Sequence, residues 1–260
     1  MSLTCGIIGL PNVGKSTIFN ALTSSSIPAE NYPFCTIEPH MGIVPLPDSR
    51  LDVLEKIYTP EKVTPANVEF TDIAGLVKGA SKGEGLGNQF LGQIRQVDAI
   101  IHVVRCFEDE NISHVEESID PIRDIELIET ELLLADLSTI EKTIMRLEKL
   151  SKTDKKISVD FELVKKLKIF CDDGNPARNF SCNSSELNFI KSMFLLTAKP
   201  IMYIANINEE ELVSDSHGKF SDLLFSKFDK AGSEVIKLCG KVEQEISTLD
   251  KNEQVEFLSE

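Results

Sequence analysis

The first part of the chain alternates short apolar runs with segments whose apolar residues recur at helical spacing. Four runs predict strands: Cys5–Ile8, Met41–Leu46, Asn67–Asp72 and Ala99–Val104. Three other segments predict helices: Lys15–Leu22, Ser49–Tyr58 and Gly87–Gln96. The last strand is almost continuously apolar, as strands buried in a parallel sheet are. The alternation predicts an α/β fold, with a mainly parallel sheet and helices on both faces.

The middle of the chain has a different pattern. Apolar residues spaced three and four apart over Arg123–Leu150 predict a long helix. After a polar turn at Ser151–Lys156, a second helix is predicted over Phe161–Ile169. The two helices are expected to form an antiparallel hairpin that resembles a short coiled coil. The segment Gly174-Asn175-Pro176 ends it, and a third helix is predicted over about Ser185–Leu196.

The last part returns to the α/β pattern. It predicts a strand, a helix and a strand, followed by helical residues to the last residue: Pro200–Ala205, Phe220–Lys230 and Glu234–Leu238. The simplest organisation is therefore one α/β domain that is interrupted by a helical insertion. In this division the α/β domain comprises residues 1–124 and 199–260, and the insertion comprises residues 125–198.

One segment between the first predicted strand and helix, residues 9–16, matches the phosphate-binding pattern G-x-x-x-x-G-K-[ST] in the setting that this pattern requires. Glycines let such a loop bend until its N–H groups point at phosphate oxygens, and the helix start adds partial positive charge. Lys15 is expected to reach the β- and γ-phosphates as a catalytic residue, and the Ser16 hydroxyl to bind Mg²⁺. The predicted nucleotide-binding residues of this segment are Gly9, Leu10, Pro11, Asn12, Val13, Gly14, Lys15, Ser16 and Thr17.

Two further segments fit a site that senses the γ-phosphate. Asp72-Ile73-Ala74-Gly75 ends a predicted strand and fits D-x-x-G, in which Asp72 would hold Mg²⁺ through water and the Gly75 N–H would approach the γ-phosphate. Thr36, in the loop before the second strand, would close over Mg²⁺. An ordinary turn at the strand end and a solvated loop threonine are the alternatives.

The residue after Gly75 is Leu76, where Ras-like switch proteins have a glutamine that orients the attacking water. Because an aliphatic side chain cannot hydrogen-bond water, hydrolysis is expected to be slow or to need another group or ion. His114, in a predicted loop after the fourth strand, is a candidate to position water, and an ordinary exposed histidine is the alternative.

The predicted base site departs from the guanine-binding pattern N-K-x-D. In Asn206-Ile207-Asn208-Glu209, Ile207 replaces the lysine and Glu209 replaces the aspartate that accepts two hydrogen bonds from guanine. The longer glutamate is expected to be misplaced for these bonds, so guanine selectivity should be lost and adenine held by Asn206 and nearby backbone. Cys239-Gly240-Lys241 is expected to face the base. A plain surface acid is the alternative for Glu209, and for Phe107 we favour a core position over stacking on the base.

Composition narrows the function classes. The formal net charge of −15 excludes a surface that coats nucleic acid generally, although residues 142–168 are rich in lysine and could contact RNA phosphates or form a solvated coiled-coil face. The six cysteines form no C-x-x-C pair, which favours reduced thiols in a cytoplasmic protein over a zinc or disulfide framework. The chain shows no apolar run of membrane-spanning length and no signal-peptide pattern.

These motifs together resemble the YchF subfamily of Obg-like P-loop NTPases. The resemblance rests on residues 9–16, on Asn31–Pro39, on Val103–Phe107, on Asp120–Glu126 and above all on the glycine-rich run that follows Asp72. It covers nearly the whole chain and implies a G domain with a helical insertion, use of ATP, and a regulatory role on the ribosome. It also implies a potassium ion supported by Asn12; a loop asparagine with only local hydrogen bonds is the alternative. Members usually continue into a C-terminal TGS domain of about 100 residues, which we do not expect within these 260 residues.

The sequence thus predicts a cytoplasmic, Mg²⁺-dependent ATPase that acts as a molecular switch, with nucleotide and ribosome as partners and neither membrane nor DNA. Two alternatives stay open. A GTP-specific switch GTPase would result if local backbone restores guanine recognition. A nucleotide-dependent binding module with negligible turnover would result if nucleotide only orders the loops that a partner recognises.

Overall fold

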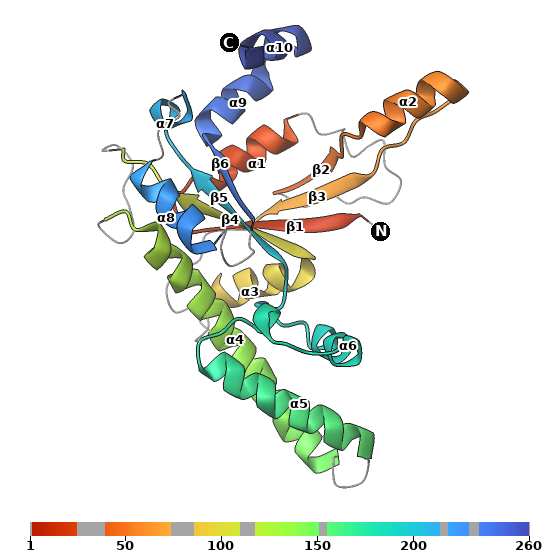
Figure 1. Cartoon of the computed structure of the whole chain (residues 1–260), viewed down its shortest axis with the longest axis vertical. Helices are drawn as coiled ribbons and strands as arrows, with labels where there is room; N and C mark the ends of the chain where they lie inside the picture. The colour runs from red at the N-terminus through yellow and green to blue at the C-terminus, as the bar shows by residue number, and fades with distance from the viewer. Residues whose placement is uncertain are drawn as a thin grey trace.

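The computed structural model places a mixed sheet at the centre of the molecule (Figure 1). It describes residues 2–24, 40–73, 86–109, 118–150, 155–213, 218–228 and 234–259. In these residues the sheet has the strand order β2-β3-β1-β4-β5-β6. The strands are β1 (Leu3–Ile8), β2 (Met41–Pro45), β3 (Asn67–Asp72), β4 (Ala99–Arg105), β5 (Ile201–Asn206) and β6 (Glu234–Leu238).

All neighbouring strands run parallel except β2, which lies antiparallel to β3 at one edge. β1 is central: Ile7 pairs with Asp72 of β3 on one side and with Ile101 of β4 on the other. Strand β4 is buried over nearly its whole length, as its continuous apolar sequence predicts. The order β3-β1-β4 brings the ends of β1 and β3, where the candidate phosphate and metal residues lie, to the same edge of the sheet.

Helices cover both faces of the sheet (Figure 1). α1 and α9 pack together on one face, whereas α3, α4 and α8 lie on the other. The helices are α1 (Lys15–Thr23), α2 (Ser49–Tyr58), α3 (Leu86–Gln96), α4 (Pro121–Leu150), α5 (Lys155–Asp172), α6 (Ser184–Ser192), α7 (Glu209–Val213), α8 (Lys219–Phe228), α9 (Gly240–Thr248) and α10 (Lys251–Ser259). The predicted α/β fold with a mainly parallel sheet is confirmed.

The long helix α4 contributes to three hydrophobic cores. Ile125 near its start packs in a core with Tyr203 of β5 and Leu224 of α8. Ile128 and Leu132 in its first half pack into the core beneath the sheet. Ile140 and Leu147 in its second half pack with Val164 of α5, in a separate core of the helical hairpin. The antiparallel hairpin expected from the spacing is therefore present, and it extends from the sheet on a continuous helix (Figure 1). The division into a domain and an insertion stays a prediction.

The predicted end of the third helix is wrong: α6 ends at Ser192 rather than at Leu196. Phe194 has a left-handed backbone with φ 52°, which an α-helix cannot accommodate. Beyond it the N–H groups of Leu196 and Thr197 each donate to the buried carboxylate of Asp136 over 2.7 Å. The polar requirements of this buried connection therefore outweigh the helical spacing of its apolar residues.

The predicted helix Phe161–Ile169 is observed as the longer α5, which begins at Lys155, inside the predicted polar turn. The other predicted boundaries agree with the observed elements to within a few residues. The predicted helix Phe220–Lys230 is observed as α8, and its last two residues lie outside the described part of the chain. Within the described ranges, every helix is either too short or too polar to span a bilayer.

Candidate nucleotide site

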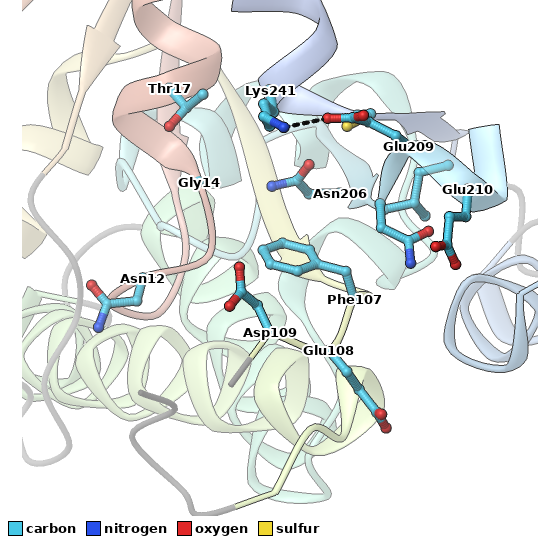
Figure 2. Close-up of a pocket in the computed structure, with 13 residues that line it drawn as sticks. Asn12, Gly14, Thr17, Phe107, Glu108, Asp109, Asn206, Glu209, Glu210 and Lys241 are labelled. Carbon is cyan, nitrogen blue, oxygen red and sulfur yellow. Dashed lines mark hydrogen bonds and ion pairs between the residues drawn. The ribbon is translucent and has the colours of Figure 1, made fainter. Parts of the chain in front are cut away.

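The phosphate-binding loop, residues 9–16, joins β1 to α1 at the carboxyl edge of the sheet. After β1 the chain forms β2 and β3 on one side of that strand, and it then crosses to β4 on the other side. Such a reversal of strand order opens a crevice at the carboxyl edge of the sheet. A pocket of about 720 Å³ lies there (Figure 2). It is lined by residues that follow β1, β4, β5 and β6: Asn12, Gly14, Thr17, Phe107, Glu108, Asp109, Asn206, Ile207, Asn208, Glu209, Glu210, Cys239 and Lys241.

The loop backbone requires glycine at its two ends. Gly9 and Gly14 have φ values of 154° and 97°, a region that side chains disfavour. A Cβ atom on Gly9 would lie 2.4 Å from the carbonyl oxygen of Val103, and one on Gly14 would lie 2.3 Å from Nδ2 of Asn206. The glycines of the motif therefore let the loop pass close to β4 and β5. Asn12 at the loop tip is also left-handed, with φ 62°.

The remaining loop residues anchor the turn. Leu10 and Val13 are buried in the core beneath the sheet, and Pro11 between them is half-buried. Thr17, in the first turn of α1, is half-buried and lines the pocket. The packing of Leu10 and Val13 therefore holds the loop in place, while Asn12 and Gly14 line the pocket.

The Lys15 side chain lies buried inside the phosphate-binding loop. Its ammonium donates to the carbonyl oxygen of Leu10 over 2.7 Å, and the residue is only 8% exposed. Burial lowers the pKa of Lys15, and the nearby charge of Asp72 partly opposes that shift. A buried cation whose hydrogen-bond partner is a main-chain oxygen is suited to exchange that partner for a phosphate oxygen.

Ser16 and Asp72 meet although they lie far apart in the sequence. The Ser16 hydroxyl donates to Oδ2 of Asp72 over 2.7 Å. The other carboxylate oxygen, Oδ1, is buried and has no hydrogen-bond partner among the described residues. A hydroxyl and an incompletely satisfied carboxylate are the oxygen ligands that Mg²⁺ prefers, so these residues fit a magnesium site.

Asn206 joins three parts of the site. Its Nδ2 donates to the carbonyl oxygen of Val13 over 2.8 Å, and its Oδ1 accepts from the N–H of Gly240 over 2.9 Å. The side chain is buried, and Gly240 is the first residue of α9. Both polar atoms of Asn206 therefore already bind backbone, and only their remaining hydrogen-bonding capacity is available to a base.

The neighbours of Asn206 have separate roles. Ile207 is buried in the core on this side of the sheet, where Cys239 packs as well. Cys239 also precedes α9 and lines the pocket. Glu209 begins α7, and its Oε1 forms an ion pair with Nζ of Lys241 over 2.6 Å across the mouth of the pocket (Figure 2). Glu209 is thus a pocket residue with a specific partner rather than a plain surface acid.

Phe107 is not a core residue, and the expectation that it would be one is wrong. It is half-buried, lines the pocket and projects between Asn206 and Asp109 (Figure 2). The buried guanidinium of Arg105 lies 4.8 Å from its ring centroid and donates to its carbonyl oxygen over 3.0 Å. Arg105 therefore fixes an aromatic ring at the wall of the pocket, as a platform for a base would require.

Comparison with known proteins places this geometry in a family. Residues 4–149, more than half of the chain, match the family model described as "50S ribosome-binding GTPase". The chain is 50% identical to the "Ribosome-binding ATPase YchF" of Bacillus subtilis and to that of Haemophilus influenzae, and covers 71% of each. In both comparisons the whole of this chain is aligned. The chain belongs to the YchF family.

A solved structure supports the same assignment. The "Schizosaccharomyces pombe YchF GTPase" is 36% identical and superposes with a TM-score of 0.85 over 99% of this chain and 71% of that one. The resemblance noted in the sequence is confirmed, and the chain is a P-loop nucleoside triphosphatase by family. The names of these relatives differ in the nucleotide: the bacterial relatives are called ATPases, whereas the fission yeast relative is called a GTPase.

Some predicted residues of the YchF site cannot be placed. Thr36, Gly75 and His114 lie outside the described residues, as does Leu76. Sequence reasoning assigned no individual role to Arg105 or Asp109, and it placed Lys241 only in the base-facing segment Cys239-Gly240-Lys241. The pairing of Lys241 with Glu209 could not be predicted, because the two residues belong to different connections of the sheet.

The basic region of the hairpin is less uniform than its sequence. Lys165 pairs with Glu162, and Lys168 pairs with both Glu141 and Asp172. These cations on α5 are therefore neutralised within the hairpin. The charges of exposed Lys142, Arg146 and Lys149 remain on α4, and that of exposed Lys166 remains on α5, so a contact of the hairpin with RNA stays a hypothesis.

Proposed function

We propose that this chain is a ribosome-associated P-loop nucleoside triphosphatase that binds ATP with Mg²⁺ and hydrolyses it slowly as a molecular switch. The observation that carries the proposal is the buried Lys15 ammonium in its loop, beside the Ser16–Asp72 pair. Such a set binds and activates a polyphosphate. The chemistry is in-line attack of water on the γ-phosphate.

Each residue has a defined role in this proposal. Lys15 exchanges the Leu10 carbonyl for phosphate oxygens, and the N–H groups at the start of α1 bind the same phosphates. Ser16, Asp72 and Thr36 would hold Mg²⁺, which supplies positive charge against the charge on the phosphate oxygens. Gly75 and Thr36 sense the γ-phosphate through the segments in which they lie.

Slow turnover follows from Leu76, which cannot orient water. His114 is the residue that we propose to position water in its place. Asn12, at the left-handed tip of the loop, is the proposed support for a potassium ion, which would add the charge that an arginine finger supplies in other switches.

A preference for ATP is proposed from the base end of the pocket. Ile207 is buried in the core and cannot serve as the lysine of the guanine pattern, and Glu209 is already paired with Lys241. GTP is the second candidate, because the matching family model and the fission yeast relative both carry the name GTPase. The ribosome as partner and a cytoplasmic location are proposed from the names of the bacterial relatives.

The decisive experiment is calorimetric titration of nucleotide-free protein with ATP and with GTP, each with Mg²⁺. We expect ATP to bind more tightly, and Lys15→Met to weaken ATP binding by at least about tenfold. Lys227→Met is the matched control, since Lys227 forms an ion pair with Glu126 on α4. GTP binding that is about tenfold tighter than ATP binding would establish the GTPase alternative. Binding of neither nucleotide would refute the proposal.

Turnover and partner are tested separately. Phosphate release by wild type and by Lys15→Met measures hydrolysis, and co-sedimentation with ribosomes in the presence of each nucleotide measures association. If wild type binds the ribosome in a nucleotide-dependent way but its phosphate release equals that of Lys15→Met, the chain is a binding module and not an ATPase.

A further inference from the structure

The base end of the pocket contains an ion pair whose position points to nucleotide selection. Glu209 is the first residue of α7, and Lys241 lies in the first turn of α9. Their charged atoms are 2.6 Å apart, and both residues line the pocket (Figure 2). Two separate connections of the sheet therefore meet in this one contact at the pocket mouth.

We propose that Lys241 is a specificity-determining residue, which disfavours guanine by occupying the carboxylate of Glu209. This inference rests on the proposed function, because it concerns the same nucleotide pocket. Guanine presents two adjacent donors, N1–H and N2–H₂, and a free carboxylate near the base accepts both. Adenine lacks this donor pair. When an oxygen of the carboxylate already accepts from an ammonium, the affinity for guanine therefore falls more than the affinity for adenine.

The neighbouring acids show that the contact is specific to Glu209. Glu211 turns the other way, and its Oε1 accepts from the N–H of Gly218 over 3.2 Å, before α8. Glu210 lines the pocket and forms no ion pair among the described residues. Of these three consecutive acids, Glu209 alone is the one whose carboxylate is joined to α9.

The surroundings of Lys241 favour the pair. The pKa of Lys241 is raised, first by its hydrogen bond with Glu209 and then by the charges of Glu209 and of Glu245, one turn further along α9. Lys241 is the one cation among the described residues that line the pocket, against Glu108, Asp109, Glu209 and Glu210. Removing its charge would therefore free Glu209 and leave the base end wholly acidic.

The test compares the ratio of ATP to GTP affinity in wild type and four variants, each titrated with both nucleotides and Mg²⁺. The variants are Lys241→Gln, Glu209→Gln and the double variant, and the matched control is Lys227→Gln. The control breaks an ion pair of the same 2.6 Å length, between Lys227 and Glu126, whose residues do not line this pocket. All substituted side chains are exposed by 43% or more, so folding should be retained, and thermal unfolding checks this.

We expect Lys241→Gln to move the ratio toward GTP by about threefold to fivefold, the range in which exposed ion pairs act. Glu209→Gln and the double variant should not gain GTP affinity, because the accepting carboxylate is gone. Lys227→Gln should leave the ratio unchanged. This pattern supports the proposal, since a merely structural role of Lys241 would change both nucleotides alike.

Three results overturn the proposal. The first is a ratio in Lys241→Gln that stays within about twofold of wild type, including equal weakening of both nucleotides. The second is a double variant that keeps the shift, which would show that it does not act through Glu209. The third is a wild-type protein that binds neither nucleotide, and this result alone also refutes the proposed function.

Discussion

Asn206 is the residue whose removal should most clearly reveal how the site is held together. Replacement by alanine deletes the hydrogen bond of Nδ2 to the Val13 carbonyl and that of Oδ1 from the Gly240 N–H. The residue is 5% exposed, so water cannot readily replace the lost partners. The Gly240 N–H is especially sensitive, because it begins α9 and the first N–H groups of a helix have no partner within the helix.

The magnitude follows from these two contacts. A buried polar group that loses its partner costs about 1–3 kcal/mol, so two such groups lower the free energy of unfolding by about 2–4 kcal/mol after relaxation. For a chain of this size, about 2–4 °C of melting temperature is lost per kcal/mol. We therefore expect Asn206→Ala to melt about 5–15 °C below wild type.

Thermal and urea unfolding, followed by circular dichroism, measures this effect. Asn208→Ala is the control, since Asn208 lies two residues further along and its Oδ1 accepts a single hydrogen bond, from the N–H of Glu211 over 2.9 Å. Asn208 is exposed, and its variant should lose about 1 kcal/mol. If the two variants melt within about 2 °C of each other, the connecting role assigned to Asn206 is incorrect.

Three further predictions concern other parts of the site and its support. Gly14→Ala should abolish measurable nucleotide binding in calorimetry, because its backbone has φ 97° and the new Cβ would meet Asn206. His102 is buried and its pKa is lowered to about 3, chiefly by burial. The unfolded chain therefore gains a proton below about pH 6.5 that the folded protein does not. Stability should fall with pH from there toward 3, by up to about 1.4 kcal/mol per pH unit, and His102→Leu should flatten this part of a urea-unfolding profile. Asp136→Ala leaves two buried N–H groups and a hydroxyl without their acceptor, and should lower the unfolding free energy in urea by about 3–5 kcal/mol.

The phosphate end of the site could be predicted from the sequence because its residues are contiguous. The loop of residues 9–16 contains its own turn, its own cation and the start of its own helix. Even the long-range partner Asp72 could be found, because it ends a strand that sequence patterning identifies. The strands themselves were predictable for the same reason: their apolar runs are local features.

The base end could not be predicted to the same depth, because its contacts join segments that folding brings together. Glu209 and Lys241 approach only when β5 and β6 pair, and each looks like an ordinary surface charge in isolation. Phe107 was assigned to the core because an aromatic residue after a buried strand most often lies there. The stacked guanidinium of Arg105, two residues earlier, determines the position of the ring, and no sequence period reveals it.

The altered base motif becomes intelligible once its positions are separated by their physical roles. Asn206 binds backbone on two sides, so it is needed for the loop and for α9 whichever base is bound. Ile207 belongs to the core, where an aliphatic side chain gains by burial and a lysine would lose. Glu209 extends to the pocket rim, where its side chain is 49% exposed and that of its partner Lys241 is 70% exposed. The effect that we propose for Lys241 therefore acts at the rim, because the phosphate loop and the core do not depend on that ion pair.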